Sequence, residues 1–173
     1  MCGIAGWADF NRNIKKETGI MERMSQSLAP RGPDEHGSFY DNHCCLVHRR
    51  LTVIDPENGK QPMTQGNYTI CYNGEIYNTG ELQKELEDMG YSFGGHSDTE
   101  VLLTAYLQWG DDCLEHLNGI FAFAVWDSAR KKLFMARDRA GVKPLYYALV
   151  DGGVVFASEP KAMLLHPGIK PLI

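Results

Sequence analysis

Apolar and polar residues follow one another along the chain in patterns that predict short strands and amphipathic helices mixed throughout its length. Between Ile20 and Leu28, apolar residues recur at the spacing of one helix face. The segment 30–33 has a proline at each end and must end that helix, because proline lacks the backbone N–H that a helix needs. Three apolar runs in the first half of the chain predict strands, over residues 4–8, 43–48 and 68–72.

Two helices are predicted in the middle of the chain. The first has Asn78 as its N-cap and Gly90 as its C-terminal stop, with an apolar face between them. The second begins at Ser97, which forms a capping-box pattern with Glu100, and it ends at Gly110. In a capping box, each of the two side chains accepts a hydrogen bond from the backbone N–H of the other residue.

Beyond residue 119 the pattern changes to strands. The run 121–126 is apolar without alternation, which predicts a strand covered on both faces. The segment 151–153, Asp-Gly-Gly, is a hairpin turn signal, and a last short helix is predicted over residues 158–165. These patterns favour an α/β or α+β domain with antiparallel hairpins, in which stacked sheets are covered by helices. Further strands are predicted over residues 132–137, 145–150 and 154–157.

Composition and charge narrow the class of protein. The chain has 173 residues, of which 43% are hydrophobic and 23% charged, and its formal net charge is −5. These values are typical of one globular domain, and the acidic balance argues against a nucleic-acid partner. No apolar run approaches the roughly 20 residues of a membrane span, so no membrane partner is expected. The sequence reaches Asp9 without the apolar stretch of a secretory signal, which favours the cytoplasm.

The pattern of the five cysteines predicts reduced thiols and no metal site. Their number is odd, and no two of them are spaced as C-x-x-C. Cys44 and Cys45 are adjacent and flanked by His43 and His48, which could suggest metal ligands. Neighbouring residues of a strand point to opposite faces, so these two thiols are not expected to share an ion.

Cys2 is the first candidate for catalytic chemistry. Methionine is commonly removed before a small second residue, and this would leave Cys2 with a free α-amine. An α-amine has a pKa of about 7.7–8.0, so it can serve as a general base at neutral pH. One residue would then supply both the thiol nucleophile and the base. A cysteine at the second position is more often inert, so this hypothesis needs support from the rest of the chain.

Nine ordered motifs supply that support. They are M-C-G-I-A-G at 1–6, R-G-P-D at 31–34, H-R-R-L-T-V-I-D at 48–55, G-K-Q-P-M at 59–63, N-G-E-I-Y-N at 73–78, S-D-T-E-V at 97–101, G-I-F-A-F-A at 119–124, R-D-R-A-G-V-K-P-L-Y-Y at 137–147 and A-S-E-P-K-A-M at 157–163. Over essentially its whole length the chain resembles the glutamine-hydrolysing half of the asparagine synthetase family, a class II glutamine amidotransferase. The resemblance implies the α+β N-terminal-nucleophile hydrolase fold, a four-layer αββα sandwich of two stacked, mostly antiparallel sheets between helices.

The resemblance also implies catalytic roles by position. Cys2 corresponds to the nucleophile that attacks the side-chain amide of glutamine, and a thioester forms as ammonia leaves. Asn73 and Gly74 correspond to the oxyanion hole, through a side-chain amide and a backbone N–H that both also contact the substrate. Taken alone, Asn-Gly is a turn signal, so this assignment depends on the motif around it.

Charged residues correspond to the two ends of a site for a free amino acid. Arg50 resembles the arginine that binds the α-carboxylate of glutamine, and the family spacing H-x-R-L selects it over Arg49. Glu75 and Asp98 resemble the acceptors for the α-ammonium group. Two alternatives stay open: both arginines could be solvated, and an acid at position 98 would stabilise the start of a helix in any case. Four residues that follow Arg50 would line the same pocket: Leu51, Thr52, Val53 and Ile54.

Domain organisation and partners follow from the same resemblance. Residues 1–165 correspond to the glutaminase domain, and residues 166–173 resemble a connector toward an ATP-dependent synthetase domain, present in cis or in trans. No cofactor is expected in the glutaminase domain itself. ATP and Mg are implied only for the synthetase domain, whose phosphate-binding loop is absent from this sequence. L-glutamine is the expected small-molecule partner, and a homodimer is an assembly that the sequence leaves open.

Three functions remain in competition at this stage. The first is a glutaminase domain whose ammonia is used to make asparagine from aspartate. The second is another class II amidotransferase, of purine or amino-sugar synthesis, which the motifs at 73–78 and 137–147 disfavour. The third is a catalytically silent regulatory or interaction module.

The sequence departs from the family at Pro30, where a histidine is common. Lys143 and its neighbours Arg137 and Arg139 are expected to have a structural or interdomain role.

Overall fold

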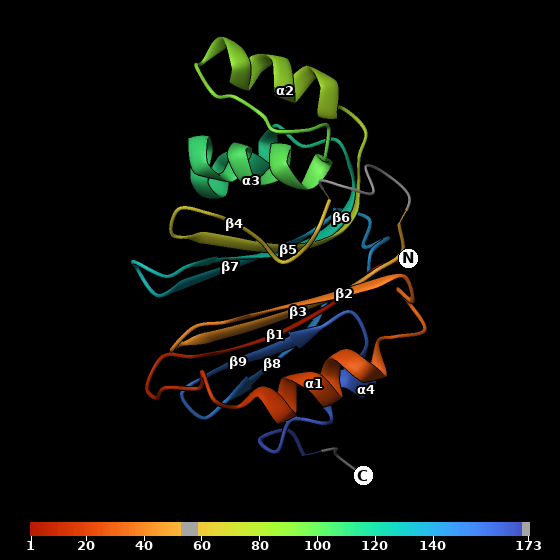
Figure 1. The fold of residues 1–173 in the computed structure, drawn as a ribbon, viewed down its shortest axis with the longest axis vertical. Coiled ribbons are helices and arrows are strands. Elements are labelled where there is room, and N and C mark those ends of the chain that lie inside the picture. Colours follow the sequence, from red (N-terminus) through yellow and green to blue (C-terminus); the bar gives the residue numbers. More distant parts are fainter. Residues whose placement is uncertain (53–58, 171–173) are drawn as a thin grey trace.

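Two antiparallel sheets lie face to face in the computed structural model, which describes residues 1–52 and 59–170 (Figure 1). The first sheet has the strand order β2-β3-β1-β9-β8, and the second has the order β4-β5-β6-β7. The strands of the first sheet are β1 (Gly3–Asp9), β2 (Glu35–Tyr40), β3 (Cys44–Arg50), β8 (Tyr146–Val150) and β9 (Gly153–Ala157). Those of the second sheet are β4 (Met63–Gln65), β5 (Tyr68–Ile76), β6 (Gly119–Asp127) and β7 (Lys132–Arg137).

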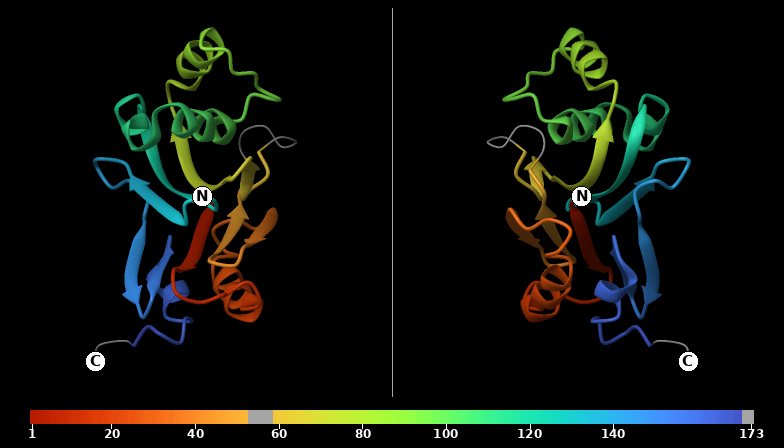
Figure 2. Two further views of the ribbon diagram at one scale, coloured as in Figure 1. Left: turned by 90° about the vertical axis from the view of Figure 1, so that its left-hand side faces the viewer. Right: turned by 90° about the vertical axis from the view of Figure 1, so that its right-hand side faces the viewer.

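Helices cover the outer face of each sheet (Figure 2). Helix α1 (Thr18–Ser27) and the short α4 (Pro160–Met163) pack on the first sheet. Helix α3 (Asp98–Trp109) packs on the second sheet, α2 (Thr79–Asp88) lies beyond it, and the 3-10 helix η1 (Gly110–Glu115) follows directly. This arrangement confirms the expected αββα sandwich. Among the described residues, no helix has the length and apolar character needed to cross a membrane.

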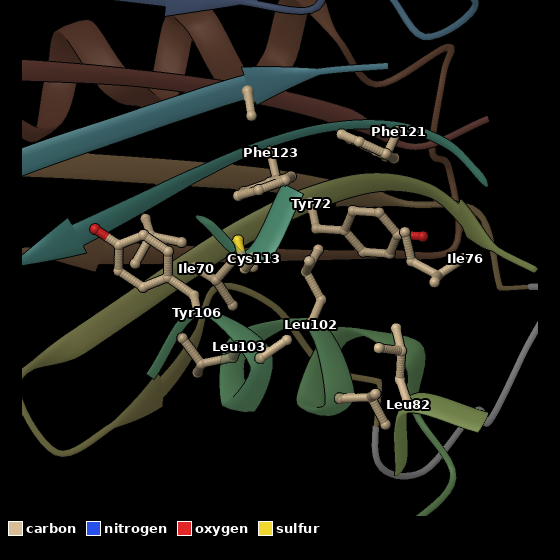
Figure 3. Close-up of a cluster of buried hydrophobic side chains, with 14 of the residues drawn as sticks. Ile70, Tyr72, Ile76, Leu82, Leu102, Leu103, Tyr106, Cys113, Phe121 and Phe123 are labelled. Atoms are coloured by element: carbon tan, nitrogen blue, oxygen red, sulfur yellow. The ribbon is translucent and has the colours of Figure 1, made fainter. Parts of the chain in front are cut away.

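Three buried layers hold the sandwich together, and strand alternation produces them. Between the two sheets, Ile4 and Phe156 of the first sheet meet Trp126 of the second. On the far side of the first sheet, Trp7 packs beneath α1. On the far side of the second sheet, Phe123 packs beneath α3 (Figure 3). The run 121–126 therefore lacks alternation because both of its faces are covered, as the sequence predicts.

The cysteines on β3 separate as expected from this alternation. Cys44 points into the layer between the sheets, whereas Cys45 points toward α1. Burial raises the pKa of the Cys45 thiol to about 12, so it stays protonated. The part of the chain that the structure describes holds no group of three side chains arranged to bind a metal ion.

Most strands begin and end within a few residues of the predicted positions. The predicted strand 132–137 coincides with β7, and the turn at Gly152 has a φ of 76°, which glycine adopts without strain. Two strands were not predicted. Strand β2 forms one edge of the first sheet, and β4 forms one edge of the second sheet. Both are short or largely polar and lack a run of buried apolar residues.

The helix boundaries lie close to the predicted ones except in the last helix, which was predicted over residues 158–165 and spans only Pro160–Met163. The predicted capping contacts are not formed. Ser97 is the N-cap residue of α3, yet its side chain makes no capping hydrogen bond. Glu100 instead accepts hydrogen bonds from the backbone N–H groups of Gly94 and Gly95, at 2.9 and 3.2 Å. The predicted capping box is therefore wrong, because the preceding loop brings two nearer donors to the Glu100 carboxylate.

The segment after residue 165 begins inside the domain. His166 is only 4% exposed, and its ring makes a T-shaped contact with the Trp7 ring, with 4.3 Å between the ring centroids. The backbone N–H of Gly168 donates to Nδ1 of His166 at 3.1 Å. The first residues of the expected connector thus pack on the first sheet, and the division of the chain at residue 165 stays a prediction.

Candidate active site

Cys2 immediately precedes β1. The N-terminus lies at one end of the sandwich, close to both sheets (Figure 1). Its Sγ accepts a hydrogen bond from the backbone N–H of Leu51 at 3.4 Å and donates to the carbonyl of Leu51 at 3.6 Å. Nε of Arg31 donates to the Cys2 carbonyl at 3.0 Å, and Arg31 is itself paired with Glu159. The backbone of residue 2 is therefore fixed, while its thiol is held by weak bonds.

A pocket of about 180 Å³ opens at Cys2, and it collects most of the predicted site residues. Seven of the ten line it: Cys2, Arg50, Leu51, Asn73, Gly74, Glu75 and Asp98. Thr52 instead donates its backbone N–H to Asp34 at 2.8 Å, and it is not among the residues that line this pocket. The predicted contributions of Val53 and Ile54 fall outside the described residues.

Asn73 and Gly74 lie within β5, paired with Ala122 and Phe121 of β6. The alternative that Asn-Gly forms a hairpin turn is therefore wrong. A Cβ at position 74 would approach the carbonyl oxygen of Ile120 to 2.3 Å, so this close strand contact requires glycine. Asn73 lines the pocket, although the residue is only 2% exposed.

The side-chain amide of Asn73 carries an unused donor. Within residues 1–52 and 59–170, Nδ2 of Asn73 has no hydrogen-bond partner. Leaving a buried donor unsatisfied costs about 1–3 kcal/mol, so such a group calls for an explanation, and a catalytic role is one of them. The free N–H therefore points to an acceptor that arrives in the pocket beside Cys2.

The structure separates the two neighbouring arginines. Arg49 turns toward α1, where Nε donates to Oγ of Ser25 at 2.9 Å and NH2 donates to the side chain of Gln26 at 3.0 Å. Arg50 turns toward the pocket, and its side chain is only 6% exposed. NH1 of Arg50 donates to Glu35 at 2.9 Å, so neither arginine is a merely solvated charge.

Asp98 is the first residue of α3, and it faces the pocket opposite β5. The hydroxyl of Tyr72 donates to Oδ2 of Asp98 at 2.8 Å. Burial raises the pKa of the Asp98 carboxyl, and the nearby Glu75 raises it further, while the hydrogen bond from Tyr72 acts in the opposite direction. A cation in the pocket would favour the charged form of Asp98.

Sequence interpretation missed two side chains that shape this pocket, Tyr72 and Gln61. Oε1 of Gln61 accepts a hydrogen bond from the backbone N–H of Tyr72 at 2.6 Å, and its Nε2 donates to Oγ1 of Thr99 at 3.1 Å. Gln61 belongs to the motif G-K-Q-P-M, which carried no assigned role. The motif marked the residue as notable, but only the folded chain shows its partners.

The loop after β7 also reaches the pocket, through Lys143. Asp138 shapes this loop by accepting backbone hydrogen bonds from Val142, Lys143 and Phe121. Burial raises the pKa of Asp138, but these bonds outweigh that effect and hold the pKa below its usual value. Arg137 donates to the carbonyl of Lys143 at 2.7 Å. Nζ of Lys143 lies 3.3 Å from the sulfur of Met1, so the side chain of this loop residue contacts the first residue of the chain.

His48 links the two sheets behind the pocket. Its Nε2 is 3.0 Å from the carbonyl oxygen of Tyr72, so the ring carries its proton on Nε2 and donates to that carbonyl. Burial lowers the pKa of His48 to about 4, and the positive charge of Arg50 acts in the same direction. His48 is therefore neutral at physiological pH, and it is not among the residues that line the pocket at Cys2.

A family model described as "Glutamine amidotransferase domain" matches residues 1–173. Asparagine synthetase [glutamine-hydrolyzing] 3 of Bacillus subtilis is 52% identical over 174 residues, which are 98% of this chain and 28% of that protein. Asparagine synthetase [glutamine-hydrolyzing] of Zea mays is 38% identical over 167 residues, 94% of this chain and 28% of that protein. The chain thus spans just over a quarter of the length of these relatives.

Solved structures agree on the fold at lower identity. Glutamine phosphoribosylpyrophosphate amidotransferase from B. subtilis, complexed with ADP and GMP, superposes with a TM-score of 0.74 at 21% identity, over 95% of this chain and 43% of that one. A second structure, described as the allosteric regulatory enzyme of purine biosynthesis, gives a TM-score of 0.77 at 21% identity and the same coverage. At this identity the two structures support the sandwich architecture alone.

Proposed function

Because the chain belongs to the glutamine amidotransferase domain family, we propose that it hydrolyses the side-chain amide of L-glutamine to glutamate and ammonia. One observation carries this proposal. Cys2 lines the same small pocket as Asn73, whose buried Nδ2 has no hydrogen-bond partner within the described residues. A nucleophile and an unused hydrogen-bond donor at one site are two of the groups that acyl transfer requires.

The reaction begins once Met1 has been removed and the α-amine of Cys2 is free. That amine accepts the thiol proton, and the sulfur attacks the amide carbon of glutamine. Nδ2 of Asn73 and the backbone N–H of Gly74 donate to the oxygen that becomes negatively charged. The amine returns its proton to the leaving nitrogen, so ammonia departs and a thioester remains on Cys2. Water then attacks the thioester and releases glutamate.

Charges at the other end of the pocket select a free amino acid. The guanidinium of Arg50 binds the α-carboxylate, and Asp98 with Glu75 accepts hydrogen bonds from the α-ammonium group. These residues come from β3, α3 and β5, so the folded sandwich brings them together from separate parts of the chain. A glutamine inside a peptide chain lacks both charges and would lose both of these interactions.

The direct experiment measures ammonia and glutamate released by the purified chain and by its Cys2→Ala variant. We expect loss of hydrolysis with an unchanged thermal melting curve, because residue 2 lies only partly buried at the start of a strand. Cys113→Ala is the matched control, since Cys113 is buried beneath α3, outside the residues that line the pocket. Glutamine hydrolysis by Cys2→Ala would refute the role of Cys2. A parent chain that hydrolyses no glutamine would refute the proposal and favour a silent module.

The ammonia is proposed to serve an ATP-dependent synthetase domain that makes asparagine from aspartate. Support comes from the relatives, which are named as glutamine-hydrolysing asparagine synthetases and extend well beyond the matched region. Purine or amino-sugar synthesis is less supported, because the purine enzymes share only 21% identity. In this scheme ATP and Mg belong to the synthetase domain. Residues 1–165 form the glutaminase unit, and residues 166–173 form the connector. The proposed location is the cytoplasm.

A further inference from the structure

The residue before Asn73 makes a contact that the proposed mechanism does not use. Tyr72 is 3% exposed, and its ring packs among apolar side chains beneath α3 (Figure 3). Its hydroxyl leaves this cluster and donates to Oδ2 of Asp98 at 2.8 Å. Both Tyr72 and Asp98 line the pocket. A tyrosine buried in an apolar layer thus presents its polar end to an acid at the site.

We propose that Tyr72 is a positioning residue for substrate binding, whose hydroxyl holds the Asp98 carboxylate in the orientation that receives the α-ammonium group. The inference rests on the proposed glutamine site and adds a residue to which no role is assigned above. The hydrogen bond from Tyr72 to Oδ2, together with the backbone N–H groups of Ile76 and Thr99, holds the Asp98 carboxylate at the edge of the pocket. A carboxylate fixed in this way binds an ammonium group without first losing conformational freedom.

Gln61 holds Tyr72 and the start of α3 in a fixed relation. Strand β4 begins at Met63, which pairs with Ile70 of β5, so the ladder between the two strands does not extend to Tyr72. The side-chain oxygen of Gln61 takes the place of a strand partner and accepts the backbone N–H of Tyr72 at 2.6 Å. Its nitrogen donates to Oγ1 of Thr99, the residue next to Asp98, at 3.1 Å. One side chain therefore ties the donor strand to the helix that carries the acceptor.

The opposite side of the Tyr72 backbone is also held. Nε2 of His48 lies 3.0 Å from the carbonyl oxygen of Tyr72, and His48 is 1% exposed. Hydrogen bonds from two other segments thus fix both backbone polar groups of Tyr72. The phenol has little freedom to leave Asp98, and this is the condition for positioning rather than incidental contact.

The test compares steady-state kinetics of the full chain with Tyr72→Phe and Tyr106→Phe. Tyr72→Phe is expected to raise the KM for glutamine about tenfold, the cost of a lost hydrogen bond to a charged group, and to change kcat by less than about twofold. Tyr106→Phe is the control, because Tyr106 is 5% exposed in the same apolar cluster but packs against Tyr68 and Phe134. Its KM is expected to match that of the parent chain.

A pH profile separates positioning from a general structural effect. The Asp98 carboxyl must be ionised to bind the ammonium group, so KM rises as pH falls through its pKa. Removing the Tyr72 hydroxyl raises that pKa, because the lost hydrogen bond favours the charged form. The rise in KM should therefore begin at a higher pH in Tyr72→Phe. The other charged or titratable groups around Asp98 are Glu75 of β5, Arg50 of β3, and Cys2, Lys143 and the N-terminal amine.

A double-mutant comparison completes the design. In an Asp98→Ala background, Tyr72→Phe should change KM less than about twofold, because the partner is already missing. Gln61→Leu offers a second route to the same defect and should also raise KM with little effect on kcat. An active parent chain with an unchanged KM in Tyr72→Phe, or an equal effect of Tyr106→Phe, would overturn the inference alone. A parent chain that does not hydrolyse glutamine would instead overturn the proposed function.

Discussion

Asn73 shows how a single residue reveals a site before any ligand is seen. Its side-chain Nδ2 is buried and unsatisfied within the described part of the chain, at a cost that folding alone does not recover. The residue sits on β5 between two anchored neighbours, since Tyr72 is bonded on both backbone sides and Gly74 is pressed against β6. The donor is therefore held in place for an oxygen that becomes charged only during the reaction.

Asn73→Ala should lower kcat for glutamine hydrolysis by about 10²–10³-fold, as expected for removal of one oxyanion donor. KM should change much less, because the lost bond is strongest in the transition state. Steady-state kinetics with coupled detection of ammonia measures both constants. A normal kcat would leave Asn73 without a catalytic role and would require another explanation for its unsatisfied amide.

The adjacent arginines provide a test with an internal control. Arg50→Ala should raise KM for glutamine by at least about tenfold, because it removes the charge that binds the α-carboxylate. Arg49→Ala should leave KM unchanged and lower the thermal stability slightly, since Arg49 binds Ser25 and Gln26 of α1. Initial rates over a range of glutamine concentrations distinguish the two. The assignment of Arg50 to the α-carboxylate fails if Arg49→Ala has the larger effect on KM.

Between elements, His48 connects β3 to β5 and makes folding sensitive to acid. Its pKa is lowered from 6.5 to about 4 in the folded chain, chiefly by burial, so the unfolded chain binds its proton first as pH falls. The resulting loss in the free energy of unfolding between pH 6.5 and about 4 is on the order of 3 kcal/mol. Above pH 6.5 this residue should contribute no dependence on pH.

Urea denaturation at several pH values measures this loss, and His48→Gln isolates it. Glutamine can donate an N–H to the Tyr72 carbonyl but does not titrate, so the variant should lose less stability over the same range. Carboxylates that titrate in the same window affect both proteins and cancel in the difference. Equal slopes for the two proteins would show that His48 is protonated as readily in the folded chain as in the unfolded one.

Element positions were predictable wherever local sequence and tertiary environment agree. Strand β7 and the turn at Gly152 follow from periodicity and turn chemistry, which depend on neighbours in the sequence. Strands β2 and β4 escaped prediction because edge strands need few buried residues and so leave little periodic signal. The capping box at Ser97 failed because Glu100 found the N–H groups of Gly94 and Gly95, which a short motif cannot foresee.

At the scale of the whole molecule, the pocket forms where the first sheet, the second sheet and α3 meet. Its described residues come from six stretches between the N-terminus and the loop after β7, so sequence distance conceals their proximity. The family resemblance predicted seven of these residues from the sequence motifs alone, without any geometry. The contact between Tyr72 and Asp98 lay beyond that approach, because the two side chains meet only once α3 packs on β5.

The central claim is that Cys2, with its own α-amine free, attacks the glutamine amide. The most direct measurement treats the active chain with a diazo-ketone analogue of glutamine and locates the label by intact mass and peptide mapping. The account predicts one label, on Cys2, in chains that lack Met1, and no label on the four buried cysteines Cys44, Cys45, Cys71 and Cys113. Labelling of one of those four, or full activity in chains that retain Met1, would contradict it.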